Sequence, residues 1–229
     1  SSDGPLTKHY CMAAIGCFAV VDGEALLDSA DLIGAMSMEG LRASVGPFQE
    51  RIQLLRPIPG QIHTARNVRA ATAGSEIMLS HLNCDKVQDA YSIRCIPQVH
   101  GACRDNLAYA RTLITNELNA ATDNPLVFWD DKGQLEFLSG GNFHCEPIAF
   151  AMDIVAMSLA EIGNISERRL FALCDSTLSY GLPPNLAGHP PGLNSGYAVI
   201  SCSAAAIASE NKGLCFPASV DNIPTTSNQ

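Results

Sequence analysis

The sequence predicts an all-α protein with one short β-hairpin. Two segments, which begin at Pro97 and Pro147, repeat apolar residues every three or four positions, the spacing of a single buried helix face. Only residues 126–138 carry two short apolar runs separated by a glycine-containing turn, which is typical of a hairpin. This is the only strand pair that the sequence supports.

The chain opens with a long helical region. Between Cys11 and Met36 apolar residues recur densely and are interrupted only by small residues and scattered acids, which indicates one or two helices. Residues 56–62 then place two prolines and a glycine close together. Proline and glycine interrupt helices, so these residues predict a loop before the Ala-rich segment that follows.

The clearest helix begins at Pro97 and ends before the Asp-Asn-Pro at 123–125. Its apolar positions step by four, four, three, four and four: Val99, Cys103, Leu107, Ala110, Ile114 and Leu118. In the hairpin that follows, residues 126–128 and 135–137 flank the turn at 130–133. Its two strands are therefore predicted to pair with each other.

A second long helix begins at Pro147. Its apolar residues step by four, three, four and three: Ile148, Met152, Val155, Leu159 and Ile162. Because it carries so few charges, we expect other helices or other subunits to surround it. Residues 182–193, rich in proline and glycine, predict an irregular loop, and residues 194–214 predict a final helix whose Ala and Ser content permits close packing.

Composition restricts the class of protein. The 229 residues are 47% apolar and 16% charged, which favours a folded chain, and we expect one helical domain over residues 1–229. A net charge of -9 disfavours nucleic acid as a partner. The longest charge-free apolar stretch, residues 195–209, is shorter than the ~20 residues that cross a membrane, so no membrane span is expected. Nine cysteines without a Cys-x-x-Cys pair indicate reduced thiols and a cytoplasmic protein.

Three polar residues just before Pro97 form the first candidate site. Gln88, Tyr91 and Arg94 are spaced three apart, so one helical turn points all three toward one region. A guanidinium can give a carboxylate two parallel hydrogen bonds, and a phenol can donate or accept a proton. The alternative is structural, with Arg94 paired to a neighbouring acid and Tyr91 half-buried.

A second candidate site is the glycine-containing loop at 139–147, which leads into the helix at Pro147. Such a loop exposes backbone N–H groups to an anion or carboxylate. Three adjacent residues in it, His144, Cys145 and Glu146, are of metal-ligating type. Adjacent side chains seldom reach one ion together, so no metal site is expected.

Several blocks of sequence resemble one enzyme family. They are residues 87–95 (VQDAYSIRC), 121–125 (ATDNP), 139–147 (SGGNFHCEP), 194–196 (NSG), 209–212 (SENK) and 217–221 (PASVD). Together, in their order and intervals, they resemble histidine ammonia-lyases of the aromatic amino acid lyase family, from about Met36 to Gln229. The blocks are more similar to the histidine enzymes than to their phenylalanine and tyrosine relatives.

The resemblance implies a long antiparallel helix bundle of the ammonia-lyase type in a cytosolic homotetramer. Its reaction is the non-oxidative loss of ammonia from L-histidine to give trans-urocanate. The family activates the weakly acidic β-proton with a methylidene imidazolone, a prosthetic group that forms from an internal Ala-Ser-Gly.

The same resemblance suggests roles for six residues of this chain. Arg94 would bind the substrate carboxylate, Tyr91 would carry a proton at the reacting carbon, and Gln88 would hydrogen-bond near the substrate. The substrate-binding residues would also include Phe143, Asn142 and Gln229.

The chain departs from the family in two places. Ala-Ser-Gly does not occur in it, so the electrophile is not encoded here. The catalytic glutamate of the family follows an Asn-Gln, and the printed sequence has no residue after Asn228-Gln229. We therefore expect a central-to-C-terminal portion of a lyase, inactive by itself.

Two other functions stay open at this stage. One is a non-catalytic helical oligomerisation module, and the other is a related phenylalanine or tyrosine ammonia-lyase or aminomutase. The expected partners are L-histidine or another small amino acid, and either further copies of the chain or the missing part of the enzyme.

Overall fold

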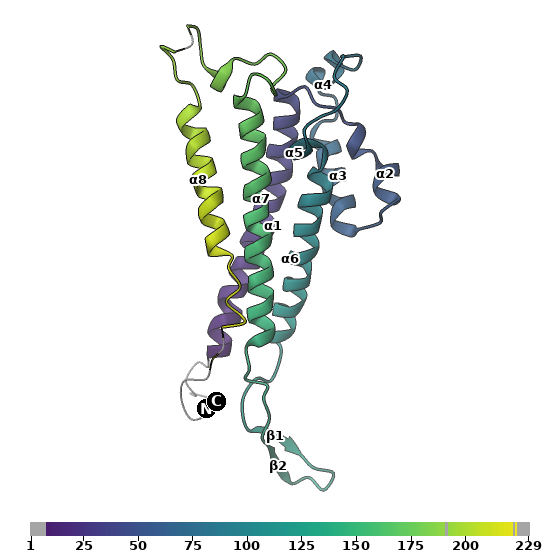
Figure 1. The fold of residues 1–229 in the computed structure, drawn as a ribbon. Helices are drawn as coiled ribbons and strands as arrows, with labels where there is room; N and C mark the ends of the chain where they lie inside the picture. Colours follow the sequence, from purple (N-terminus) through teal and green to yellow (C-terminus); the bar gives the residue numbers. More distant parts are fainter. Residues whose placement is uncertain (1–7, 191, 222, 224–229) are drawn as a thin grey trace.

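Long helices form the body of the computed structural model, which describes residues 8–190, 192–221 and 223 (Figure 1). The helices α1 (Lys8–Gly40), α6 (Ile96–Leu118) and α7 (Glu146–Cys174) pack on one another. A fourth, α8 (Ala198–Leu214), lies along α7. Helices α1 and α7 run one way and α6 and α8 the other, so the predicted antiparallel helix bundle is confirmed.

Shorter elements pack beside one half of this bundle. They are η1 (Gly46–Phe48), α2 (Glu50–Leu54), α3 (Pro59–Ala71), α4 (Glu76–Ser80) and α5 (Tyr91–Arg94), with η2 (Pro184–Leu186) between α7 and α8. Helix α3 packs against both α6 and α1, and α5 packs against α7. The base of α5, the turn that carries Tyr91 and Arg94 of the first candidate site, therefore packs on the three core helices α1, α6 and α7. Figure 1 shows α5 beside the upper part of the bundle.

Two apolar clusters fill the core, and both draw residues from α1, α6 and α7. One includes Leu27, Leu107 and Val155, and the other includes Met38, Ile96 and Ile165. The predicted inner face of α6 is confirmed at Cys103, Leu107, Ala110 and Ile114, which are all buried. Its predicted end is not buried, because Leu118 lies in the last turn, where the bundle opens to solvent.

The predicted loop at 56–62 is wrong from Pro59 onward, where α3 begins. A proline can occupy the first turn of a helix, because the amide proton it lacks has no partner there. The N–H of Gly60 instead donates to the Asp105 side chain at 2.9 Å. A Cβ on Gly60 would lie 2.1 Å from the carbonyl oxygen of Gly101, so the two glycines allow α3 and α6 to cross in backbone contact.

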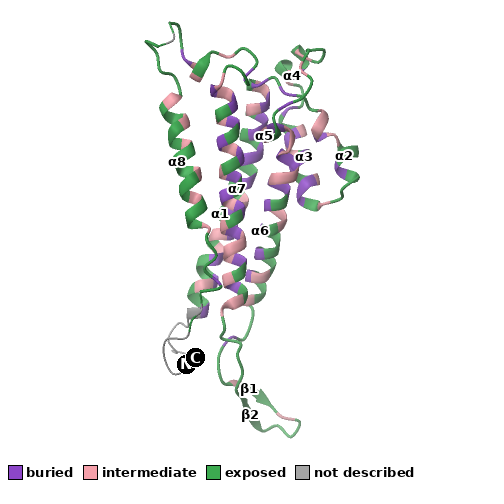
Figure 2. Cartoon of the chain, in the orientation of Figure 1, coloured by how far each residue is buried: buried purple, intermediate pink, exposed green. Residues whose placement is uncertain are grey.

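The predicted helix at 194–214 is present, but it begins four residues later, at Ala198. Gly196 has a φ of +53°, and a Cβ there would lie 2.3 Å from the Asn185 oxygen. That same oxygen accepts a hydrogen bond from the Tyr197 N–H at 2.7 Å. Although α8 packs on α7, none of its residues is buried, and Figure 2 shows it as largely exposed.

The hairpin is confirmed as the antiparallel pair β1 (Leu126–Trp129) and β2 (Leu135–Leu138), with Val127 opposite Phe137. It extends beyond the end of the bundle (Figure 1). Its large apolar side chains are exposed on both faces, and Trp129 is 72% exposed. A two-stranded sheet this short is marginally stable on its own, so we expect the hairpin to gain stability when another surface covers it.

Two helices are long and apolar enough to cross a membrane by length and composition: His9–Gly40 and Glu146–Cys174. The sequence expectation considered only charge-free stretches, and both of these helices contain charged residues. They carry Asp31 and Arg169, whose side chains are buried within the bundle. The core helix of a soluble protein meets the same criterion, so two such helices are only weak evidence for a membrane protein.

Candidate functional site

Tyr91 and Arg94 of the first candidate site lie on α5, a single helical turn between Ala90 and Cys95, whereas Gln88 lies before this turn and is not helical, so the prediction of one helical turn for all three is wrong at Gln88. Ile93 is buried in the core and holds the turn from below, while Tyr91 is 71% exposed on its outer side. The guanidinium carbon of Arg94 lies 4.8 Å from the centre of the Tyr91 ring. A guanidinium over an aromatic face is attracted by the ring electrons, so the two side chains orient each other.

Arg94 also lines a cavity of about 290 Å³ together with Gln88. Ser44 and His81 are among the other lining residues, and Tyr91 is not. The structure therefore brings Arg94 to Gln88 in a common cavity and to Tyr91 by stacking.

The segment before α5 is tied to the end of α1. The Asp89 carboxylate accepts a hydrogen bond from the Ser44 N–H at 2.7 Å and pairs with Lys86 at 2.8 Å. The Lys86 ammonium also donates to the Leu41 carbonyl at 3.1 Å and lies over the Tyr180 ring. These contacts hold the cavity wall and neutralise Lys86.

Arg94 differs from Lys86 in its charge environment. Within the part of the chain that the structure describes, no carboxylate forms an ion pair with Arg94. The structural alternative required such an acid, and none is present there. A partly exposed guanidinium at a cavity, with no carboxylate partner, is suited to bind the carboxylate of a ligand.

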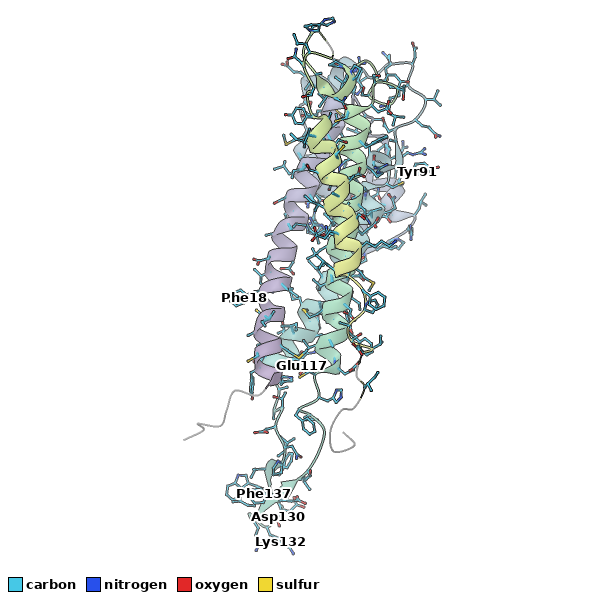
Figure 3. The ribbon with its side chains drawn as sticks, turned by 60° about the vertical axis from the view of Figure 1, so that its left-hand side comes forward. Phe18, Tyr91, Glu117, Asp130, Lys132 and Phe137 are labelled. Carbon is cyan, nitrogen blue, oxygen red and sulfur yellow. The ribbon has the colours of Figure 1, made fainter. Side chains whose placement is uncertain are left out.

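Phe143 and Asn142 lie at the opposite end of the bundle, between the hairpin and α7. The Asn142 amide donates to the Ala121 carbonyl at 3.3 Å, and Phe143 is half-exposed. The 23 residues of α6 separate them from α5, which is roughly 35 Å at the helical rise. In Figure 3 Tyr91 and the hairpin residue Phe137 lie toward opposite ends of the molecule. One chain cannot bring Phe143 and Arg94 to one amino acid, and Gln229 lies outside the described residues.

The loop at 139–147 shows no arrangement suited to a metal. The Glu146 N–H donates to the His144 ring at 3.2 Å, which uses that nitrogen for a local turn. Among residues 8–190, 192–221 and 223, no group of three or more His, Cys, Asp or Glu side chains is placed to hold an ion.

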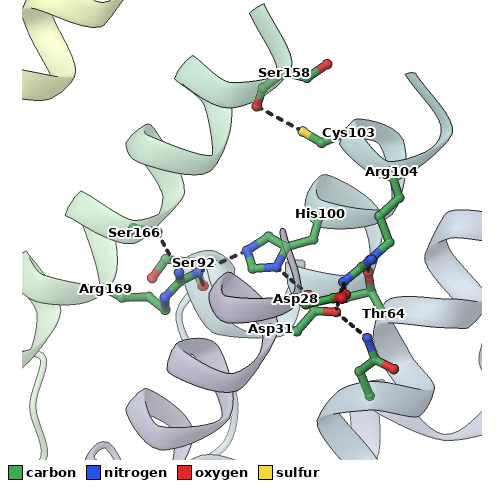
Figure 4. A network of polar contacts seen from close by, with 11 residues as sticks. Asp28, Asp31, Thr64, Ser92, His100, Cys103, Arg104, Ser158, Ser166 and Arg169 are labelled. Carbon is green, nitrogen blue, oxygen red and sulfur yellow. Dashed lines mark hydrogen bonds and ion pairs between the residues drawn. The ribbon is translucent and has the colours of Figure 1, made fainter. Parts of the chain in front are cut away.

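A buried polar layer separates the two apolar clusters, and sequence reasoning missed most of it (Figure 4). Asp31 of α1 accepts hydrogen bonds from His100 at 2.8 Å and from Arg104 at 2.7 Å. On the far side of the His100 ring, Arg169 of α7 approaches at 3.4 Å. The sequence gives no signal that these residues meet, because the partners are far apart along the chain and both Arg104 and Arg169 stand beside other charged residues.

The layer shifts the pKa of its members. Burial opposes ionisation of Asp31, yet the hydrogen bond from His100 and the charge of Arg104 hold its pKa below the usual value. Burial also favours the neutral ring of His100 and lowers its pKa, although Asp31 opposes this. Burial lowers the pKa of the Arg169 guanidinium to about 10, so Arg169 stays charged at neutral pH.

These pKa directions predict a loss of stability in acid. A group whose pKa is lower in the folded state than in the unfolded state stabilises the fold above its unfolded value, and that stability is lost as the pH falls. For His100 the loss begins below about pH 6.5, with a slope of at most about 1.4 kcal/mol per pH unit, and Asp31 adds to it below about pH 4. Urea unfolding followed by circular dichroism between pH 5 and 7.5 measures this slope. In His100→Gln the free energy of unfolding is expected to depend less steeply on pH. Equal slopes in this variant and in the unchanged chain would contradict the assignment of the effect to His100.

Comparison with known proteins gives a consistent set of relatives. The family model described as "Aromatic amino acid lyase" matches residues 7–229. A histidine ammonia-lyase of Sorangium cellulosum is 52% identical over 217 residues, which cover 94% of this chain and 42% of that protein. The chain therefore spans less than half the length of the curated relatives it matches.

Solved structures agree with the fold. The crystal structure of histidine ammonia-lyase from Trypanosoma cruzi superposes with a TM-score of 0.83 at 44% identity, covering 95% of this chain and 39% of that one. The tyrosine aminomutase from Streptomyces globisporus superposes with a TM-score of 0.88 at 37% identity, covering 95% of this chain and 44% of that one. The backbone is thus common to enzymes with different names, and only the side chains can distinguish their substrates.

Proposed function

Because the chain belongs to the aromatic amino acid lyase family, we propose that it is a segment of a histidine ammonia-lyase, the enzyme that converts L-histidine to trans-urocanate and ammonia. The observation that carries this proposal is the state of Arg94. Its guanidinium lines a cavity beside Gln88, stacks on Tyr91 and has no carboxylate partner in the described residues. A free α-carboxylate is the group common to all amino acid substrates, and it is the group that such a guanidinium binds.

Each of these three residues then has a role. Arg94 gives the substrate carboxylate two parallel hydrogen bonds and fixes its orientation. Tyr91, which is exposed beside that guanidinium, moves a proton at the reacting carbon. The Gln88 amide hydrogen-bonds the substrate from the cavity wall.

The methylidene imidazolone of the family does not fit the residues present. It needs Ala-Ser-Gly, and here Ser139-Gly140 follows Leu138 while Ser195-Gly196 follows Asn194. No step of the reaction is therefore assigned to such a group on this chain. The segment contributes substrate binding, and the electrophile has to come from other residues of the enzyme.

Assembly with further copies is part of the proposal. Phe143 and Asn142 can share a substrate with Arg94 only if they come from different copies, since one chain holds them a bundle length apart. The outer side of α1 exposes large apolar side chains, including Ile15, Phe18 and Met36. Exposed apolar patches of this kind mark protein interfaces, which supports the homotetramer that the family resemblance implies.

We place the protein in the cytoplasm as a single helical domain. The nine cysteines contain no Cys-x-x-Cys pair, which supports a reducing compartment. Both apolar clusters draw residues from α1, α6 and α7, which supports one folding unit rather than two.

A segment exchange tests the function. The matching segment of the Sorangium cellulosum relative is replaced by this chain, and the chimera is expected to form urocanate from histidine, measured by its ultraviolet absorbance. Phenylalanine and tyrosine serve as competing substrates. A well-folded chimera that prefers either of them would favour a related lyase or aminomutase, and one without activity toward any of the three would favour the oligomerisation module.

In that chimera Arg94→Ala is expected to raise the KM for histidine about 100-fold, because it removes two charge-assisted hydrogen bonds worth a few kcal/mol together. Arg51→Ala is the matched control, since Arg51 is an exposed arginine of α2 that bonds only a neighbouring glutamine among the described residues. An unchanged KM in Arg94→Ala would refute the carboxylate role.

A further inference from the structure

Arg169 makes a buried connection to the back of the candidate site. Its side chain, on α7, is among the largest fully buried ones of the described residues. One terminal nitrogen, Nη2, donates to Ser166 Oγ at 2.8 Å within the same helix. The other, Nη1, donates to the backbone carbonyl of Ser92 and to His100 Nε2, each at 3.4 Å (Figure 4).

Ser92 is the residue between Tyr91 and Ile93 on α5. This helix has four residues and no side-chain hydrogen bond at its N-cap, Ala90. A single turn of helix is not stable alone, so contacts with neighbouring elements have to fix its orientation. Burial of Ile93 supplies one such contact, and the hydrogen bond from Arg169 supplies a directional one.

The guanidinium is itself held in place from three other helices. Since Arg169 can only donate, His100 accepts at Nε2 and its Nδ1–H donates to Asp31 on α1. The lowered pKa of His100 agrees with this neutral ring. Asp31 is bound in turn by Arg104 of α6 and by Asn67 of α3. The Ser92 carbonyl is therefore connected through one guanidinium to α1, α3, α6 and α7.

We propose that Arg169 is a positioning residue, whose guanidinium fixes the Ser92 carbonyl and so sets the direction in which α5 presents Tyr91 and Arg94. Its importance for catalysis rests on the proposed function, while its effect on α5 does not. Arg169 does not line the cavity, and none of its hydrogen bonds in the described structure goes to Gln88 or Arg94, so it acts through the backbone of the turn.

A purely structural role makes a different prediction. If Arg169 only stabilised the core, its loss would loosen all protected parts of the bundle together. If Arg169 positions α5, the loss of protection from hydrogen exchange is concentrated at the amides of α5. These are the N–H groups of Ile93, Arg94 and Cys95, which donate to the carbonyls of Ala90 and Tyr91.

Amide hydrogen exchange of the full chain, read by NMR, separates the two roles. In Arg169→Met, exchange at residues 93–95 is expected to speed up at least about tenfold, with less than about twofold change at Leu107 and Ala110 of α6. Arg169→Lys keeps the charge with a single nitrogen and is expected to show a smaller selective increase. Ser166→Ala is the control, because it removes a hydrogen bond of the same guanidinium without touching the Ser92 contact, and α5 is expected to be unchanged.

If amide exchange in Arg169→Met speeds up equally throughout the bundle, or does not speed up at residues 93–95, the proposal is wrong. If Arg169→Met does not fold, Arg169→Lys decides by the same criterion. Calorimetric titration with L-histidine then tests the functional half, with affinity expected to fall about tenfold in Arg169→Met and to stay unchanged in Ser166→Ala. If the unmodified chain binds no histidine, the proposed carboxylate site fails, and the exchange data still decide whether Arg169 positions the turn.

Discussion

The purified chain of 229 residues is expected to form no urocanate from L-histidine. The proton to be removed is a weak acid, and the family resemblance assigns its activation to an electrophile made from Ala-Ser-Gly, which this sequence does not contain. Losing a single preorganised hydrogen-bond donor already costs about 10²–10³-fold in rate, and here the whole electrophile is not encoded. Arg94 and Tyr91 alone leave the chain able to hold a substrate and unable to activate it.

The measurement is the ultraviolet absorbance of urocanate over hours, with the complete Sorangium cellulosum relative, diluted 10³-fold, as the detection standard. The chimera described above is the positive control for this segment, because it contains the same 229 residues beside an electrophile. If the purified chain alone forms urocanate, the proposal that this segment binds the substrate while other residues of the enzyme supply the electrophile is refuted.

Replacement of Gly101 by alanine is expected to separate α3 from α6. A Cβ at Gly101 would lie 2.4 Å from the backbone nitrogen of Gln61 and 2.8 Å from the carbonyl carbon of Gly60. Backbone atoms cannot rotate away as a side chain can, so the helices have to move apart and uncover Gln61, Ala65 and Val68. We expect a loss of about 3 kcal/mol or more in the free energy of unfolding.

Gly213→Ala is the matched control. A Cβ there meets nothing within 4 Å, and Gly213 lies in the last turns of the exposed helix α8. Alanine is the better helix former, so this change is expected to be neutral or to stabilise by up to about 1 kcal/mol. Urea midpoints from circular dichroism compare the two variants, and a midpoint for Gly101→Ala equal to that of the unchanged chain would contradict the clash.

The sequence predicted the elements whose signals are local. The spacing of apolar residues after Pro97 and Pro147 and the turn between residues 126 and 138 identify two helices and a hairpin that the structure contains. The start of α3 could not be read in the same way. Pro59 and Gly60 are typical of a loop, and the partner that makes them helical, Gly101, lies 41 positions further on.

The same difference between local signals and partners far apart in the sequence applies to the candidate site. Gln88, Tyr91 and Arg94 lie within seven residues, so their spacing was enough to group them, although only Tyr91 and Arg94 share the turn of α5. Only the structure shows that Arg94 has no carboxylate partner among the described residues. Phe143 and Asn142 were added by resemblance, which carries no distances. Arg169 and Asp31 could not be connected at all, because nothing in a sequence indicates which lone charges meet inside a bundle.

The exposed hairpin has a consequence for how this protein is studied. Trp129 is the single tryptophan of the chain, and it lies on β1, outside both apolar clusters. Its fluorescence therefore reports the surroundings of the hairpin and is insensitive to melting of the bundle core. When another subunit covers the hairpin, the emission is expected to shift to the blue, which makes tryptophan emission a direct optical signal of association.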